Sequence, residues 1–284
     1  MLAEITSKLE NMRDLPTLPI IARRMAQAVE DPQLNMEKLS RELSKDQSLT
    51  AKILRLVNSP FYGFCGKITN LSHAMVLLGT NVVKNAVLSV SILDSFPRQV
   101  KGFSAKGLWE HVIACAVAAH WLGALMGHRH NDDLFVAGLL HDIGKVFFLR
   151  AAPDKFLEAV ELARRRGQPL IEAERAVMDC DHAEVGELMA RQWRLPADLT
   201  AAVGCHHHPF RYQGEGNLPL LVHVADALVH QLQLGRSGAD GVRVEAGVYE
   251  ALGLSRSVVE EGAAAIMANF NQAKAAFAEG GRAG

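Results

Sequence analysis

Apolar residues recur at intervals of three and four along most of the chain, which is the spacing of an amphipathic helix. One such helix is expected from Ile20 to Val29 and another over 36–43. A third is expected to begin at Asp46, a residue type favoured at helix N-caps, and to stop before Pro60. We predict further helices at residues 1–13, 72–78, 81–93, 108–127, 132–150, 154–166, 169–178, 182–194, 197–208, 217–234 and 256–278.

Alternating strand patterns are missing from the sequence. The nearest candidate, Val242 to Val248, is too short and too charged to build a sheet. The predicted fold class is therefore all-α. A polar, glycine-bearing stretch from Pro97 to Gly107 is a plausible domain boundary, so we expect two helical lobes, residues 1–100 and 101–284.

Composition narrows the function classes. The 284 residues carry a net charge of −1, so nothing global indicates binding to nucleic acid or to an acidic membrane. The four cysteines form no CxxC pair, which favours free thiols in a reducing compartment; a ligand role for Cys180 or Cys205 stays open. The N-terminus is not a signal peptide, and no apolar run approaches the roughly 20 residues of a membrane span. We expect a cytoplasmic protein.

Eleven of the twelve histidines lie at or after position 111. The stretch LFVAGLLHDIGK, residues 134–145, is an apolar run that ends in His141, Asp142 and Lys145. Adjacent imidazole and carboxylate groups suit a divalent metal, and a nearby lysine suits a phosphate. The alternative is a helix C-terminus, where His and Lys favour the helix dipole and Gly favours the capping geometry.

Further ligand types occur in apolar helical patterns of the second lobe. Each has a simpler explanation on its own: a buried histidine bonded to a carbonyl, an exposed run of histidines at a helix end, or an aspartate paired with a helix cap or an arginine. Together, five helices each offer a ligand type, which is how a metal site in a helical bundle is built. His223 and His230 share a helix face with Asp226 and could replace or orient a ligand. The candidates are His111, His141, Asp142, His182, His206, His207 and Asp226.

Six motifs together resemble the HDOD (HD-related output domain) family of bacterial signalling proteins, within the HD superfamily of metal-dependent phosphohydrolases. The resemblance runs from about residue 10 to about residue 275. The motifs are LPTLP at 15–19, DQSLTAKILRLVNSPFYG at 46–63, ITNLSHAMVLLG at 68–79, LFVAGLLHDIGK at 134–145, DHAEVGELMARQWRLP at 181–196 and HHHP at 206–209.

The resemblance implies a role for each candidate. His141 and Asp142 match the namesake metal ligands, and Lys145 matches a lysine that contacts the substrate phosphate. If the protein is an enzyme, Asp142 and Lys145 are its expected catalytic residues. The implied cofactor is one or two divalent ions, with iron, manganese or zinc compatible with these ligands. The remaining ligand positions of dinuclear HD phosphodiesterases match His111, His182, His206, His207 and Asp226.

Two functions follow from the resemblance. The one we favour is a signal-transduction output module with an HD-type metal site, acting by binding a signalling protein or a ligand. We expect no receiver domain before the motifs, and we therefore expect any phosphorylation signal to come through a partner. The alternative is a phosphohydrolase or phosphodiesterase acting on nucleotides or cyclic dinucleotides. No GYP signature follows the histidine run, where His208 to Tyr212 stands instead, and this weighs against cyclic-di-GMP as the substrate.

Overall fold

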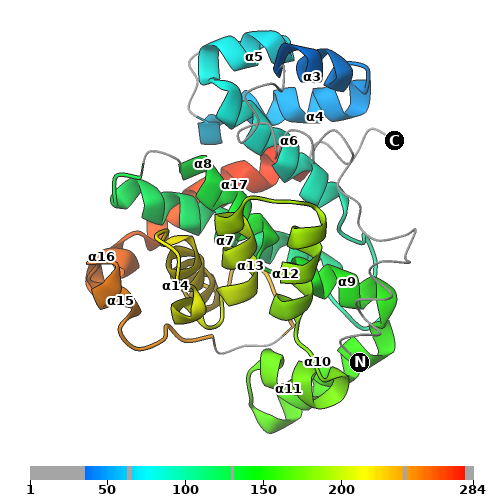
Figure 1. Ribbon diagram of the computed structural model, residues 1–284, viewed down its shortest axis with the longest axis vertical. Coiled ribbons are helices and arrows are strands. Elements are labelled where there is room, and N and C mark those ends of the chain that lie inside the picture. The colour runs from blue at the N-terminus through cyan, green and yellow to red at the C-terminus, as the bar shows by residue number, and fades with distance from the viewer. Residues whose placement is uncertain (1–35, 63–65, 129–130, 239–241, 279–284) are drawn as a thin grey trace.

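The structure is a computed structural model that describes residues 36–62, 66–128, 131–238 and 242–278. Within these ranges the regular secondary structure is helical, apart from one isolated antiparallel bridge between Val100 and Phe103 (Figure 1). The all-α prediction is therefore confirmed. The expected helices at 1–13 and 20–29 and the LPTLP motif lie outside the described residues.

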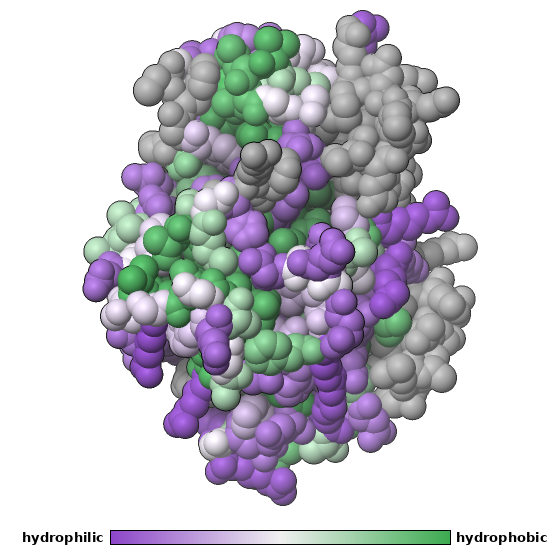
Figure 2. Space-filling view, turned by 60° about the vertical axis from the view of Figure 1, so that its left-hand side comes forward, coloured by the Kyte–Doolittle hydropathy of each residue, from purple (hydrophilic) through white to green (hydrophobic). Residues whose placement is uncertain are grey.

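The first described helices form the upper part of the molecule in Figure 1. They are α3 (Met36–Leu43), α4 (Gln47–Val57), η1 (Pro60–Tyr62), α5 (Leu71–Leu78) and α6 (Thr80–Asp94). As predicted, Asp46 caps α4, because its side chain accepts a hydrogen bond from the Leu49 amide at 2.9 Å. Phe61 packs its ring against Phe135, with centroids 4.9 Å apart, so this aromatic residue fills space in the core. Apolar side chains gather at the top of the surface in Figure 2. On α5, Val76 is largely exposed.

The second group of helices surrounds one central helix, α7, which packs against α8, α14 and α17. By length and composition α7 could cross a membrane, which the sequence reading missed, but 67% of its apolar window is buried inside the protein. Its apolar composition is therefore explained by its position as a core helix. The group comprises α7 (Ala105–Leu125), α8 (Asn131–Leu140), α9 (Ile143–Ala151), α10 (Pro153–Arg166), α11 (Leu170–Met178), α12 (His182–Gln192), α13 (Ala197–Cys205), η2 (Pro209–Arg211), α14 (Leu218–Gln231), α15 (Val248–Ala251), α16 (Arg256–Glu261) and α17 (Ala263–Ala278).

The two groups share one apolar core, since a single cluster of buried side chains runs through α4, α6, α7, α14 and α17. The last helix, α17, returns to pack on both α4 and α7 (Figure 1). A polar contact also joins the groups: Lys84 and Asn85 of α6 donate to Asp133 Oδ1 of α8 at 3.3 and 2.9 Å. The division into two domains near residue 100 stays a prediction.

The expected helix 132–150 is two helices, α8 and α9, with His141 and Asp142 in the turn between them. Two glycines, one inside each helix, set how closely α8 and α9 pack on their neighbours. A Cβ on Gly138 would lie 2.5 Å from Ala116 Cα, and one on Gly144 would lie 2.0 Å from the His182 carbonyl oxygen. Only glycine allows α8 to lie this close to α7 and α9 this close to α12.

Two other predicted helices end differently. The expected helix 256–278 is divided into α16 and α17 at Gly262, where a Cβ would overlap the Trp121 ring. The expected helix 197–208 ends at Cys205, with His206 as its C-cap residue. His207 therefore lies beyond the helix, and its ring can approach the others from a different direction.

Candidate metal centre

All seven predicted ligands meet at one place in the interior, where α7, α12, α13, α14 and the turn between α8 and α9 come together. Six of the seven are at most 3% exposed, and His207 alone among them is partly exposed. Such a concentration of buried polar groups is costly unless the groups are paired or hold an ion. Each ligand comes from one of these elements: His111 from α7, His141 and Asp142 from the α8–α9 turn, His182 from α12, His206 and His207 from the segment after α13, and Asp226 from α14.

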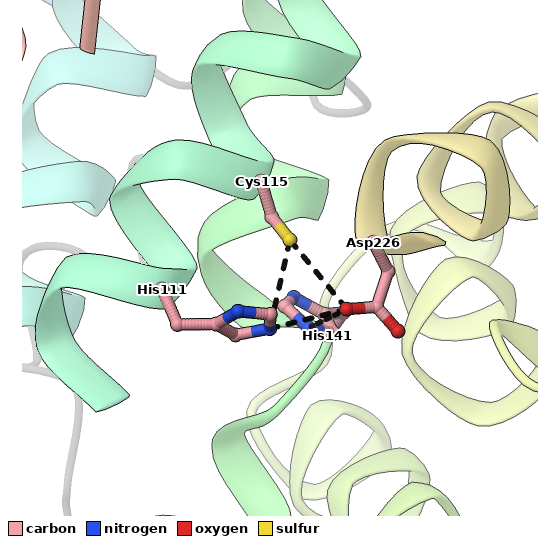
Figure 3. Close-up of side chains that lie close together, drawn as sticks. All are labelled: His111, Cys115, His141 and Asp226. Atoms are coloured by element: carbon pink, nitrogen blue, oxygen red, sulfur yellow. Dashed lines mark hydrogen bonds and ion pairs between the residues drawn. The ribbon is translucent and has the colours of Figure 1, made fainter. Parts of the chain in front are cut away.

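The first group of ligands contains His111, His141 and Asp226, together with Cys115 (Figure 3). One donor atom from each lies within 4.8 Å of all the others. Asp226 Oδ1 is 3.1 Å from His111 Nε2 and 3.9 Å from His141 Nε2. Cys115 lies one helical turn beyond His111 on α7, which places both side chains on one face.

The second group contains His182, His206 and His207, again with their donor atoms within 4.8 Å of one another. Nε2 of His182 lies 3.3 Å from Nε2 of His206 and 2.9 Å from Nε2 of His207. Three imidazole nitrogens thus converge on a small volume.

Asp142 lies between the two groups. Its Oδ1 is 3.3 Å from Nε2 of His182, in the second group. Its Oδ2 is 3.5 Å from Nε2 of His141 and 3.6 Å from Nε2 of His111, in the first group. Lys145, 4% exposed, donates a hydrogen bond to the same Oδ2 at 2.7 Å. A carboxylate in this position can bridge two ions.

The opposite nitrogens of three rings are occupied by groups that only accept hydrogen bonds. Nδ1 of His141 lies 2.7 Å from the Gly138 carbonyl, and Nδ1 of His206 lies 2.8 Å from the Val203 carbonyl. Nδ1 of His182 lies 2.6 Å from the Glu174 carboxylate. Each Nδ1 must therefore carry the hydrogen, which leaves Nε2 of each neutral ring with a lone pair aimed into the site.

The donor set fits a metal. Nε2 of His141 and Oδ1 of Asp142 are buried and have no hydrogen-bond partner. The lone pairs of His182 and His206 face each other, and a proton on His207 could satisfy only one of them. Divalent ions between these nitrogens and oxygens would satisfy the unpaired atoms, and neutral imidazole with carboxylate is a ligand set that zinc, iron and manganese accept.

The charges also suit a metal. Burial lowers the pKa of His111 to about 4, with Asp226 opposing the shift, and burial and neighbouring histidines lower the pKa of His206 and His207 well below the usual range. Burial alone would raise the pKa of Asp142, but Lys145 and the adjacent histidines outweigh it and hold that pKa well below its usual range. Neutral His111, His206 and His207 beside an ionised Asp142 are in the protonation states in which these groups bind metals. Burial alone would lower the pKa of His141, but Asp142 and Asp226 outweigh it, so that pKa is instead raised.

Sequence reasoning missed two residues at the site. Cys115 contacts the first group; its spacing of four from His111 was the available signal. Glu174 is fully buried in α11, and its Oε2 accepts from both Nδ1 and the backbone amide of His182. A glutamate at an inward position of an amphipathic helix was the signal for it.

Four other residues were possible ligands or orienting groups: His223, His230, Cys180 and Cys205. Both ring nitrogens of His223 are taken by the backbone, since Nδ1 donates to the His206 carbonyl and Nε2 accepts from the Glu245 amide. His230 lies beside the first group, with Nε2 3.5 Å from Asp226 Oδ1 and 3.2 Å from Ser237 Oγ. Cys180 and Cys205 belong to neither group of ligands.

This geometry defines an all-α protein with buried His and Asp groups that can hold a metal. The chain belongs to the HDOD domain family, whose pattern matches residues 15–209.

Two solved structures share this fold, and one curated protein is similar in sequence. An HDOD domain protein of unknown function from Geobacter sulfurreducens is 26% identical, with a TM-score of 0.81 and 97% of each chain covered. A protein from Shewanella amazonensis, provisionally assigned as a phosphohydrolase, is 20% identical, with a TM-score of 0.75 and coverage of 97% of this chain and 98% of that one. An uncharacterized protein of Treponema pallidum is 27% identical over 222 residues, which are 77% of this chain and 42% of that protein. The chain thus spans less than half of the length of that curated relative.

Proposed function

We propose that this chain binds two divalent transition-metal ions and hydrolyses a phosphoester bond in a nucleotide or a related phosphorylated small molecule. The observation that carries the proposal is the position of Asp142, whose Oδ1 faces His182 and whose Oδ2 faces His141. The first ion would be held by His111, His141, Asp142 and Asp226, and the second by Asp142, His182, His206 and His207.

When bound, two such ions supply an activated water and offset charge on the phosphoryl oxygens. The residues of the chain hold that arrangement. Glu174 and two backbone carbonyls fix the imidazole rings, so their Nε2 atoms need no reorganisation on binding. Lys145 keeps Asp142 ionised and orients it, and we propose that it also offsets charge on a substrate phosphate.

The test begins with metal analysis of protein purified without added metal and without a histidine tag. We expect about two equivalents of iron, manganese or zinc per chain. A panel of nucleotides and phosphodiesters then tests for turnover, which Asp142→Ala should abolish together with metal binding. Asp154→Ala, an exposed carboxylate in α10, is the matched control. Full metal retention by Asp142→Ala would refute the assignment.

A second function is supported by the burial of the ligands, six of which are at most 3% exposed. In this case the chain is a signalling output module, its metal centre stabilises the fold, and its activity is the binding of a signalling protein partner. Two tightly held metal ions without turnover of any phosphoester, and a lower melting temperature after chelation, would favour this function over hydrolysis.

A further inference from the structure

We propose that Cys115 is an additional ligand of the ion held by His111, His141, Asp142 and Asp226, and that its thiolate biases this site towards zinc, cobalt or iron(II). This inference rests on the proposed metal centre and assigns one of its two ions a sulfur ligand. When the metal–sulfur bond forms, the S–H bond breaks and its proton passes to solvent.

The position of the thiol matches that role. Cys115 is fully buried, and its Sγ lies 3.7 Å from His111 Nε2 and 3.8 Å from Asp226 Oδ1 (Figure 3). Neighbouring donor atoms bound to one zinc ion at about 2.0–2.3 Å lie about 3.0–3.7 Å from one another. The distances from Sγ to its two neighbours are close to these donor–donor distances, and a side-chain movement of a few tenths of an ångström would close the difference.

A second observation points to a ligand at the same place. Nε2 of His141 is fully buried, has no hydrogen-bond partner and lies in the same group of donor atoms as the Cys115 sulfur. Its Nδ1 is held by the Gly138 carbonyl, so the free lone pair cannot turn away to find another partner. An ion at the centre of this group would contact that nitrogen and the sulfur together.

A packing role is the competing explanation. The thiol can donate a weak hydrogen bond to Asp226, and buried cysteine otherwise behaves as a small apolar residue. The two explanations differ in what a bound metal contacts. A sulfur ligand selects thiophilic ions, whereas a set of only nitrogen and oxygen donors accepts manganese about as readily.

The experiment uses the full chain, stripped of metal and reconstituted without oxygen with cobalt(II). We expect two cobalt ions per chain and a near-ultraviolet absorption band from thiolate-to-cobalt charge transfer, saturating at one ion per chain. Cys115→Ser should lose this band while keeping the weaker visible cobalt bands. Cys180→Ser, at a buried cysteine outside both ligand groups, is the matched control and should keep the band.

A measurement on the unmodified chain removes any dependence on how the variant folds. X-ray absorption of the zinc-loaded protein should report a sulfur neighbour at about 2.3 Å. The preference for zinc over manganese at one site should fall by on the order of tenfold to a hundredfold in Cys115→Ser.

The outcomes separate this inference from the proposed function. Two bound ions with no sulfur neighbour and no charge-transfer band would overturn the role of Cys115 and leave the metal centre intact. No bound metal at all would overturn both.

Discussion

Replacing Glu174 by glutamine should weaken one of the two metal sites and leave the other unchanged. Glu174 does not touch the proposed ions. It accepts from His182 Nδ1 at 2.6 Å and from the His182 amide at 2.9 Å, both through Oε2. Glutamine can place its oxygen at the same point, so the fold should survive, but the acceptor loses its charge.

The magnitude follows from those two bonds. A hydrogen bond to a charged group contributes roughly 1.5–3 kcal/mol and one to a neutral group roughly 0.5–1.5 kcal/mol. The bond to Nδ1 makes the opposite nitrogen of His182 more basic, so its weakening by about 1.4 kcal/mol should appear as about a tenfold loss of metal affinity. The bond to the backbone amide should lower the stability of the fold without changing the ligand.

Competition with a chelator during a metal titration measures both sites, because two ions of different affinity give two steps. We expect one step to weaken about tenfold and the other to stay in place. Glu172→Gln, an exposed glutamate on the same helix, is the control and should change neither step. Equal weakening of both steps, or no change in either, would refute the assignment of Glu174 as the positioning residue of His182.

Three further predictions concern stability. Gly144→Ala should cost about 3 kcal/mol or more and lower the melting temperature, because its Cβ would overlap a backbone carbonyl of α12; an unchanged melting temperature would show that α9 can move away. Asp133→Ala should cost about 1–3 kcal/mol in urea unfolding, since it leaves the buried Lys84 ammonium without this partner, whereas exposed Asp154→Ala should cost little. Burial lowers the pKa of His111 from 6.5 to about 4 in the folded chain. Between these two pH values, His111 is therefore protonated in the unfolded chain and neutral in the folded chain. The metal-free protein should therefore lose stability as the pH falls through this window, by about 3 kcal/mol from this group, and urea unfolding of His111→Gln should show a shallower dependence.

Much of the fold could be predicted because helical spacing and capping are local properties. The apolar positions of α4 and its Asp46 cap are examples, and the structure has both as expected. The break between α8 and α9 could not be predicted in this way. It accompanies the close packing of Gly138 and Gly144 on helices that are distant in sequence, and a glycine in an apolar run gives no sign of what lies against it.

The same distinction between local properties and distant contacts applies to the candidate site. Residues whose type is unusual for their setting, such as an aspartate in the apolar helix that carries Asp226, could be found from the sequence. Cys115 and Glu174 could not be assigned, because a buried cysteine is ordinary in a core and the partner of Glu174 lies on another helix. Their roles depend on distances that only the folded chain defines.

The two proposed functions differ in what they require of the more exposed group of ligands. His207 is partly exposed and His208 beside it is exposed, whereas the first group of ligands, with Cys115, is enclosed by α7, α8 and α14. Solvent and any substrate therefore meet the second group first. A hydrolase needs an open coordination position on that side, which a fourth ligand such as His207 would occupy unless it moves. A binding module needs no such opening, because a closed centre stabilises the fold as well as an open one. We therefore expect hydrolysis by this chain to require that His207 leave the proposed metal, and the binding function to leave it in place.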